Sequence, residues 1–292
     1  MSSYAPAWLR LTKHHGLGND FLVVIDPWRP VDGDDAVRWC DRRTGVGADG
    51  LIQAVPIGGP GRLDAAEPPT TNWRMTLWNS DGGRAEISGN GLRCLAQALA
   101  ERLGHDGADD LALAIETDAG PREAIVLARS ADAVPGEDRV RVGMGKAVDG
   151  PGPSDRWGGL GVEVLDQVGV DVGNPHLVGF VDPATPIDGF DMAAIGPPVE
   201  ADHPGGLNVH VVRVVGRRRI EMAIWERGAG VTQACGSGAC AAAWAANRAG
   251  LVDGAAGVEV VMPGGAAIVE VLDDEVVLTG PAVRVAEVRV DG

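Results

Sequence analysis

The residues best suited to chemistry lie in a glycine-rich segment around Cys235. The segment Ala234-Cys-Gly-Ser-Gly-Ala239 precedes an alanine-rich run that predicts a helix ending near Gly250. A thiol at the start of a helix lies beside unpaired backbone N–H groups and the positive end of the helix dipole, and both favour its thiolate form. A free cysteine is more often a small buried side chain. Because the flanking glycines expose the backbone, we interpret Cys235 as a chemically active thiol.

A similar segment surrounds Ser88, about half a chain earlier. Ile87-Ser-Gly-Asn-Gly-Leu92 likewise combines a small polar residue, a Gly-x-Gly turn and a helix of small residues. The repetition predicts a duplication, and chance similarity between glycine-rich turns is the alternative. Two helix N-termini that face one another would bind a carboxylate or phosphate. One proton-transfer group at each would suit racemisation, in which one group removes an α-proton and the other returns a proton on the opposite face.

The elements that must position these groups are two buried helices and the strands around them. A helix without a broad polar face is normally buried. Helices are predicted at 34–43, 92–103, near 190–195 and after Cys235, and a Pro/Gly-rich loop follows 57 up to about 71. Alternating apolar residues predict strands at 8–11, 21–26, 51–57, 73–78, 111–117, 122–129, 138–144, 161–168, 170–180, 207–215, 218–225, 257–261, 266–272, 275–279 and 283–290.

The repeated order of elements predicts two similar domains, each wrapped around one helix. We place the first domain at residues 1–133, with a returning strand at 281–292, and the second at 134–280, because a polar Pro/Gly linker occupies 130–137.

The composition limits the possible partners. The chain has 41 acidic and 25 basic residues, a formal net charge of −16. Such a surface repels nucleic acid and anionic membranes, and no apolar run approaches membrane-spanning length. Four cysteines in 292 residues do not make a disulfide scaffold, and Cys235 and Cys240 lack histidines at zinc-ligand spacing. We therefore expect a soluble, cytoplasmic protein that uses no metal and binds neither nucleic acid nor membrane.

The sequence resembles the diaminopimelate epimerase family, which belongs to the PLP-independent two-base racemases. The resemblance is carried by motifs in one order along nearly the whole chain: His15-Gly-Leu-Gly-Asn-Asp-Phe21, Arg43-Thr-Gly-Val-Gly-Ala-Asp-Gly50, Asn79-x-Asp-Gly82, Gly89-Asn-Gly91 with Arg93, Gly173-Asn-Pro-His176, Asn208-Val209, Glu226-Arg-Gly-Ala-Gly230 and Ala234-Cys-Gly-x-Gly-Ala239. It implies an α+β fold of two pseudo-symmetric domains, each a mainly antiparallel sheet or barrel wrapped around a central helix. It also implies an active site between the domains, a homodimer, and catalysis without a cofactor.

The resemblance also implies roles for individual residues. Cys235 matches one catalytic acid/base, and Ser88 stands at the position of the other. The positions that match substrate-binding residues are Asn19, Asn79, Asn174, Asn208, Glu226 and Arg227, and those expected to give N–H groups to the reacting carboxylate are Gly89, Asn90, Gly236 and Ser237. Arg227 is suited to bidentate binding of a distal carboxylate. His176 either polarises and positions the site or makes a structural hydrogen bond.

Two positions depart from the family pattern. Ser88 stands where the family carries its first catalytic cysteine, and Val231 stands where a glutamate is usual. A serine hydroxyl is a far weaker acid than a thiol, so Ser88 makes a poor base. Three explanations remain open: an engineered replacement, a natural variant that works slowly or on another amino acid, or a protein that no longer turns over.

The implied activity is the epimerisation of LL-2,6-diaminopimelate to the meso form, for lysine and peptidoglycan synthesis. Cys235 and the Ser88 position would act as the two bases. The alternatives are a related PLP-independent racemase, epimerase or isomerase acting on another amino acid, and an impaired Cys→Ser form that binds its ligand without turnover.

Overall fold

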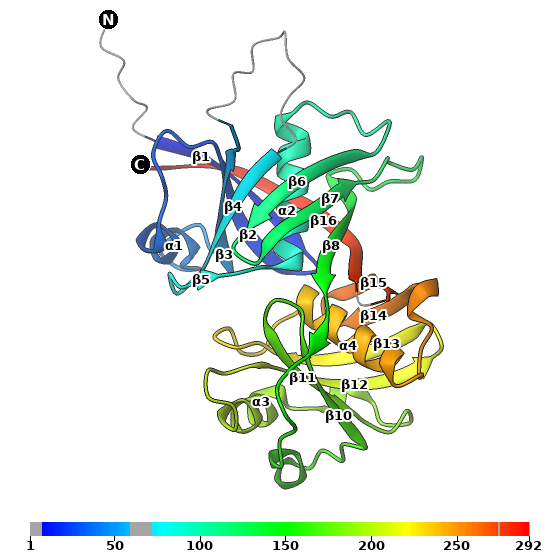
Figure 1. Cartoon of the computed structure of the whole chain (residues 1–292). Helices are drawn as coiled ribbons and strands as arrows, with labels where there is room; N and C mark the ends of the chain where they lie inside the picture. Colours follow the sequence, from blue (N-terminus) through cyan, green and yellow to red (C-terminus); the bar gives the residue numbers. More distant parts are fainter. Residues whose placement is uncertain (1–7, 59–71, 274, 292) are drawn as a thin grey trace, which may run out of the picture. The chain divides into compact units, whose positions relative to one another are not determined.

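The computed structural model describes residues 8–58, 72–273 and 275–291, which form two compact units. Unit 1 comprises Met1–Gly16, Asp20–Val142 and Pro281–Gly292, and unit 2 comprises Leu17–Asn19 and Gly143–Gly280. Most of the loop predicted after residue 57 lies outside the described residues. The colours of Figure 1 show that unit 1 combines the blue-to-green first part of the chain with its red end.

Unit 1 is an eight-stranded barrel around one helix. Its strands follow the order β1-β2-β3-β4-β6-β7-β8-β16, and β16 pairs back with β1 to close the barrel. The strands are β1 (Trp8–Gly16), β2 (Asn19–Ile25), β3 (Gly50–Pro56), β4 (Asn72–Asn79), β6 (Leu111–Thr117), β7 (Gly120–Val126), β8 (Glu137–Lys146) and β16 (Glu275–Asp291), while the two-residue β5 (Arg84–Ala85) pairs with β4. Most pairs are antiparallel; β2–β3 and β4–β6 are parallel.

Helix α2 (Gly89–Arg102) fills the barrel of unit 1. All its residues from Gly89 to Ala100 are buried, and it packs against β1, β3 and β7. Figure 1 shows α2 among the strands, whereas the short α1 (Gly33–Cys40) lies outside them. Trp39 of α1 packs with Leu9, Leu11 and Leu22 on the outer face of the sheet. The sheet of unit 1 is therefore covered on both faces in this region.

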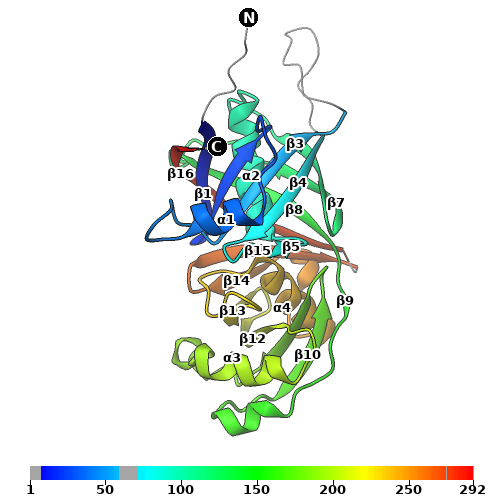
Figure 2. The ribbon, with the colours of Figure 1, turned by 90° about the vertical axis from the view of Figure 1, so that its left-hand side faces the viewer.

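Unit 2 repeats the plan of a sheet around a buried helix. The strand order is β16-β15-β14-β13-β12-β11-β10-β9. Its strands, besides the first part of β16, are β9 (Val148–Asp149), β10 (Asp166–Asp171), β11 (Pro175–Phe180), β12 (Asn208–Gly216), β13 (Arg219–Trp225), β14 (Val258–Met262) and β15 (Gly265–Leu272). Helix α4 (Gly236–Arg248) is buried from Gly236 to Ala246, and both views show strands around it (Figures 1 and 2). Small side chains let these strands approach the helix closely.

Helix α3 (Met192–Ala201) covers the outside of the unit 2 sheet. It buries Met192, Ile195 and Val199 in one apolar cluster with Val209 and Val211 of β12. Short 3₁₀ turns complete the unit at Arg156–Leu160, Ile187–Gly189 and Gly254–Ala256.

The predicted α+β class, with barrels around central helices, is confirmed, but several predicted boundaries are wrong. The segment 161–165 is irregular and strand β10 begins only at Asp166, while 170–180 is two strands joined at Val172–Asn174. Helix α3 continues to Ala201 through Pro197 and Pro198, because its apolar face is buried against β12. The segments 275–279 and 283–290 form the single strand β16.

The division between the units lies later than the predicted linker. Strand β8 begins at Glu137 and still pairs with β7, with Ala124 opposite Val142. Unit 1 therefore extends to Val142 and resumes at Pro281. The polar Pro/Gly segment at 130–137 is therefore a turn within unit 1 and not the boundary between the units.

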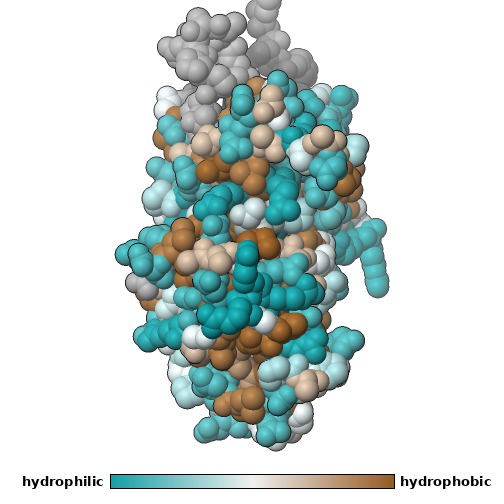
Figure 3. Space-filling view, turned by 90° about the vertical axis from the view of Figure 1, so that its right-hand side faces the viewer, coloured by the Kyte–Doolittle hydropathy of each residue, from teal (hydrophilic) through white to brown (hydrophobic). Residues whose placement is uncertain are grey.

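The surface is largely polar. Figure 3 shows one face on which hydrophilic residues predominate and apolar ones form separate patches. Exposed large apolar side chains are scattered through the sequence, as at Trp28, Val134 and Leu165. Among the described residues, no helix is both long enough and apolar enough to span a membrane.

Candidate active site

Cys235 is the N-cap of helix α4. Its backbone is extended, with φ −122° and ψ 109°, and Sγ accepts a hydrogen bond from the backbone N–H of Gly238 at 3.3 Å. Only glycine fits at position 238, because a Cβ there would lie 2.5 Å from Cε1 of His210 and 3.0 Å from Sγ of Cys235. The glycine-rich turn thus lets the helix start directly against the thiol and a histidine ring.

Ser88 has the same place in unit 1 that Cys235 has in unit 2. It is the N-cap of α2, with φ −142° and ψ 119°, and Oγ accepts from the backbone N–H of Gly91 at 3.0 Å. The repeated segment of the sequence therefore gives the same cap geometry in both units. Ser88 is half-buried, whereas Cys235 is 2% exposed.

The Cys235 thiol is protonated in this environment. Burial raises its pKa well above the ordinary value, and the carboxylate of Glu226 raises it further, by its charge and by a hydrogen bond with the thiol. The N–H of Gly238 and the hydroxyl of Ser237 lower the pKa but do not outweigh these effects. The helix terminus was expected to favour the thiolate, but loss of hydration on burial acts in the opposite direction and is the larger effect. Cys235 is a neutral thiol that can donate a proton.

Glu226 provides a proton acceptor beside that thiol. It follows β13, in a turn closed by hydrogen bonds between its backbone and that of Gly230 at 2.7 and 2.8 Å. Its carboxylate accepts a hydrogen bond from the hydroxyl of Thr232. Val231, which departs from the family pattern, is 54% exposed. The described contacts of Glu226 therefore do not depend on the side chain at position 231.

Asn174, His176 and His210 extend the hydrogen bonds of this site. His176 Nε2 lies 2.9 Å from Oδ1 of Asn174, and its Nδ1 lies 2.9 Å from Nε2 of His210. The Asn174 amide donates to Oγ of Ser237 at 3.4 Å, and that oxygen lies 3.7 Å from Sγ of Cys235. Hydrogen bonds through Asn174 and Ser237 thus connect His176 to Cys235.

Asn208 and Arg227 complete the unit 2 part of the site. The side chain of Asn208 donates to the carbonyl of Pro175 at 3.0 Å and accepts from the backbone N–H of Arg227 at 3.1 Å. Asn208 therefore fixes the loops that carry Asn174 and Arg227. The Arg227 side chain is exposed, and its guanidinium donates to the carbonyl of Gly205 at 3.3 Å. Asn19, half-buried, belongs to the segment Leu17–Asn19 of unit 2.

The other predicted residues lie in unit 1. Gly89 and Asn90 are the first two residues of α2, as Gly236 and Ser237 are of α4. The first N–H groups of a helix have no acceptor within it, so these positions are suited to bind an anion. Asn90 is buried, and its Oδ1 accepts from Arg93 at 2.7 Å. Asn79 is exposed at the end of β4.

The remaining cysteines do not provide a second base. All four cysteines are in the reduced form. Burial raises the pKa of Cys94 to about 12, and burial with nearby Asp20 raises that of Cys40 to about 12. Cys94 lies in the second turn of α2 and is fully buried, so it does not replace Ser88.

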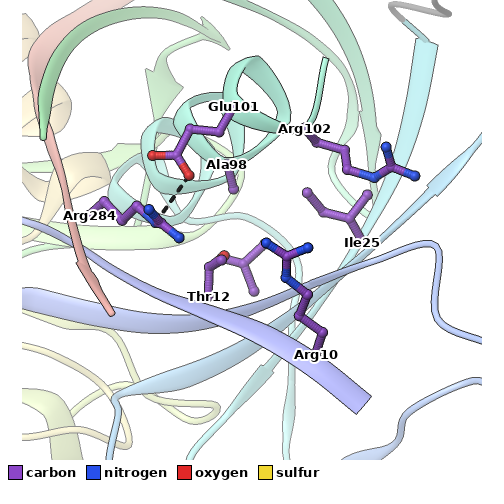
Figure 4. Close-up of a pocket in the computed structure, with 8 residues that line it drawn as sticks. Arg10, Thr12, Ile25, Ala98, Glu101, Arg102 and Arg284 are labelled. Atoms are coloured by element: carbon purple, nitrogen blue, oxygen red, sulfur yellow. Dashed lines mark ion pairs between the residues drawn. The ribbon is translucent and has the colours of Figure 1, made fainter. Parts of the chain in front are cut away.

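A cavity of about 560 Å³ in unit 1 is separate from these residues. It is lined by Arg10, Thr12, Val23, Ile25, Ala98, Glu101, Arg102 and Arg284 (Figure 4). Arg10 pairs with Glu287 at 2.6 Å, and Arg284 pairs with Glu101 at 3.2 Å. Carboxylates thus already neutralise two of its arginines, and we assign the cavity no part in the chemistry. Among the described residues, no cluster of three or more His, Cys, Asp or Glu could hold a metal ion.

Two residues of the site were missed by sequence reasoning, His210 and Thr232. His210 had a usable signal, because residues two apart on a strand share a face and 207–215 was predicted as a strand containing Asn208. Thr232 had none, since its contact with Glu226 depends on the turn at Gly230.

Acid is expected to destabilise the protein below about pH 6.5. Burial lowers the pKa of His14 to about 4 and that of His210 to about 3, whereas an unfolded histidine titrates near 6.5. The contribution of these two histidines to the free energy of unfolding is complete above about pH 6.5. It is lost as the pH falls below that value, because only the unfolded state then binds the protons. Each histidine should reduce the free energy of unfolding by about 1.4 kcal/mol per pH unit. Urea unfolding at about pH 7, 6 and 5 tests this, and a constant free energy would contradict it.

Comparisons with known proteins identify the family. The family model described as diaminopimelate epimerase matches residues 11–149 and 168–285. A diaminopimelate epimerase of Magnetococcus marinus is 38% identical over 94% of this chain and 95% of that protein. One of Synechocystis sp. is 37% identical over 95% of this chain and 97% of that protein.

A solved structure agrees in fold. A predicted epimerase from Pseudomonas aeruginosa superposes with a TM-score of 0.72 at 17% identity, covering 97% of this chain and 99% of that chain. The sequence matches extend over both units and include the segments that carry Cys235 and Ser88. The chain belongs to the diaminopimelate epimerase family.

Proposed function

We propose that the protein epimerises one α-carbon of LL-2,6-diaminopimelate to give the meso form, without a cofactor. The observation that carries the proposal is the buried Cys235 thiol, placed at the start of α4 beside the Glu226 carboxylate. The relatives named diaminopimelate epimerase support the substrate. Lysine and peptidoglycan synthesis are the pathways that would use the product.

Cys235 is proposed to serve one face of the α-carbon. When it acts as an acid, its proton moves from Sγ to the carbanion-like carbon, and the resulting thiolate is held by the N–H of Gly238. When it acts as a base, its own proton must first pass to Glu226, which is placed to accept it. N–H groups at the starts of α2 and α4 are proposed to bind the α-carboxylate, which stabilises the negative charge that develops on deprotonation.

Ser88 is proposed to stand at the opposite face. Its hydroxyl is a poor base, so it would relay a proton slowly or hold a water. Ser88 also favours a second candidate, a related racemase or epimerase for another amino acid, or a form that binds without turnover. We further propose that the protein is a cytoplasmic homodimer without nucleic-acid or membrane partners. Light scattering on the purified protein tests its oligomeric state.

Incubation with LL-diaminopimelate in D₂O tests the proposed reaction. We expect loss of the α-proton together with formation of the meso epimer. Exchange without inversion would show Cys235 working alone on one face and would limit the protein to half of the reaction. If neither event occurred in the wild type or in Ser88→Cys, the protein would not be this epimerase.

Arg227→Ala is expected to raise KM for diaminopimelate by roughly 10- to 100-fold while changing kcat less. A guanidinium–carboxylate hydrogen bond contributes about 1.5–3 kcal/mol, and a bond to the distal carboxylate is made equally in the ground and transition states. Steady-state kinetics measure the effect. Arg217→Ala is the matched control, because Arg217 also donates from an exposed guanidinium to a carbonyl, that of Gly250. An unchanged KM in Arg227→Ala would contradict the substrate assignment.

A further inference from the structure

We propose that His210 is a positioning residue, which sets the direction of a hydrogen-bond chain running through His176, Asn174 and Ser237 to the sulfur of Cys235. This inference rests on the proposed function, since it assigns a role at the same site. His210 Nε2–H donates to His176, His176 donates to Asn174, Asn174 donates to Ser237, and Ser237 donates to Cys235.

The two histidines are held rigidly side by side. They lie on the neighbouring parallel strands β11 and β12, where Val178 is opposite His210. Both are fully buried, and their rings meet edge to edge, with centroids 5.2 Å apart and ring planes inclined by 26°. A Cβ at position 238 would lie 2.5 Å from Cε1 and 2.6 Å from Nε2 of His210, so the start of α4 packs directly against that ring. The 2.9 Å contact between His176 Nδ1 and His210 Nε2 is therefore fixed by the packing.

Each ring carries one proton. Burial lowers the pKa of His176 well below its ordinary value, and the neighbouring His210 and Arg227 lower it further; burial alone lowers that of His210. In a neutral imidazole, one nitrogen donates and the other accepts. The chain therefore has only two possible arrangements, in which every hydrogen bond runs in one direction or in the other.

The unbonded nitrogen of His210 decides between the two arrangements. His210 Nδ1 is buried and has no hydrogen-bond partner among the described residues. If the chain ran away from Cys235, with the Asn174 amide reversed, that nitrogen would carry a proton with no acceptor. A buried N–H without an acceptor is rarer than an unfilled lone pair. The proton thus lies on Nε2, and the chain runs towards Cys235.

This direction suits the chemistry at Cys235. It leaves the Ser237 hydroxyl proton available to donate to Sγ, 3.7 Å away in the resting thiol, and that bond strengthens when the sulfur becomes negative. Donors aligned in series also polarise one another. The same direction keeps the Asn174 carbonyl oxygen on His176 and its N–H₂ group towards the start of α4. His210 acts through Nε2, because its Nδ1 has no hydrogen-bond partner in the part of the chain that the structure describes.

Two substitutions test whether His210 is needed as a hydrogen-bond donor or only fills space in the core. His210→Gln keeps an N–H donor on a side chain of similar reach, whereas His210→Leu fills the space without a donor. His14→Leu is the matched control in unit 1. His14 is also fully buried on a strand, with Nδ1 2.8 Å from Gln97 and with no hydrogen bond to Nε2 from any residue that the structure describes. Any loss of stability from removing a buried histidine should appear in both leucine variants.

The kinetic readout is the pH dependence of kcat/KM in the wild type and in Ser88→Cys. The titratable or charged groups around Cys235 are Glu226, His176, His210 and Arg227. We expect His210→Leu to lower kcat by about tenfold or more, because the Ser237 hydroxyl is then no longer oriented to donate to the charged sulfur. For the same reason, the part of the pH profile that reports ionisation of Cys235 should move to higher pH. His210→Gln and His14→Leu should keep the original pH profile. The proposal would be overturned if His210→Leu kept both the wild-type kcat and the wild-type pH dependence of kcat/KM.

A spectroscopic readout does not depend on turnover. Long-range ¹H–¹⁵N correlation spectra of the labelled protein distinguish the two tautomers of each histidine. We expect both His176 and His210 to be protonated at Nε2 in the wild type, and His176 to lose that single tautomer in His210→Leu. Protonation of either at Nδ1 in the wild type would overturn the proposal. Absence of epimerisation in D₂O would instead reject the proposed function, with the tautomers still measurable.

Discussion

Ser88→Cys is expected to raise the kcat for epimerisation of diaminopimelate on the order of 10²- to 10⁴-fold, the range typical of a well-placed acid/base group. The sulfur should fit, since Cys235 occupies the equivalent N-cap in unit 2 with an N–H···Sγ distance of 3.3 Å. Ser88 already accepts from Gly91 in the same way, at 3.0 Å. The gain arises because a thiol ionises far more readily than a hydroxyl.

Measuring the gain requires reducing conditions and a control thiol. Initial rates of meso-diaminopimelate formation in the presence of a reductant compare the wild type with Ser88→Cys. Ser130→Cys adds a thiol at an exposed serine of unit 1 and should leave kcat unchanged. If Ser88→Cys stayed within about twofold of the wild type, Ser88 would not be at the position of the second base.

Cys235→Ser is expected to lower kcat by about 10³-fold or more and to abolish exchange of the α-proton on its face. The substitution removes the acid that gives up a proton next to Glu226, while a serine remains a good helix N-cap for the N–H of Gly238. The free energy of unfolding should therefore change little. Loss of catalysis without loss of stability separates the chemical role of Cys235 from its role at the helix start.

Cys240→Ala is the matched control for this loss. Cys240 lies in the same helix and is fully buried, and alanine is a good helix former of slightly smaller size. We expect the wild-type kcat in Cys240→Ala. Thermal unfolding and isotope exchange measured on both variants provide the comparison. Residual epimerisation in Cys235→Ser equal to that of the wild type would show that this thiol is not one of the two bases.

The protonation of Cys235 depends on features that the local sequence does not contain. The helix terminus next to Cys235 is visible in the sequence, and it does supply the N–H of Gly238. Burial and the charge of Glu226 oppose it, and neither is a property of the segment around Cys235. Glu226 reaches the thiol only because the turn after β13 returns the chain at Gly230.

The sequence by itself determined the two helices and their caps. Each start depends on residues three positions apart, as in Ser88 with Gly91 and Cys235 with Gly238, and each buried helix is marked by its own small side chains. The sequence motifs also identified the family, because many short matches in one order cannot depend on packing. Alternating residues predicted most strands for the same local reason.

The tertiary structure alone decided the protonation and orientation of the site. His176 and His210 are 34 positions apart, and only the pairing of β11 with β12 places their rings in contact. Desolvation keeps both neutral and keeps Cys235 a thiol. The strand β16 and the passage of α3 through Pro197 likewise depended on partners far along the chain. Burial and long-range pairing set these properties, and a local pattern of residues contains neither.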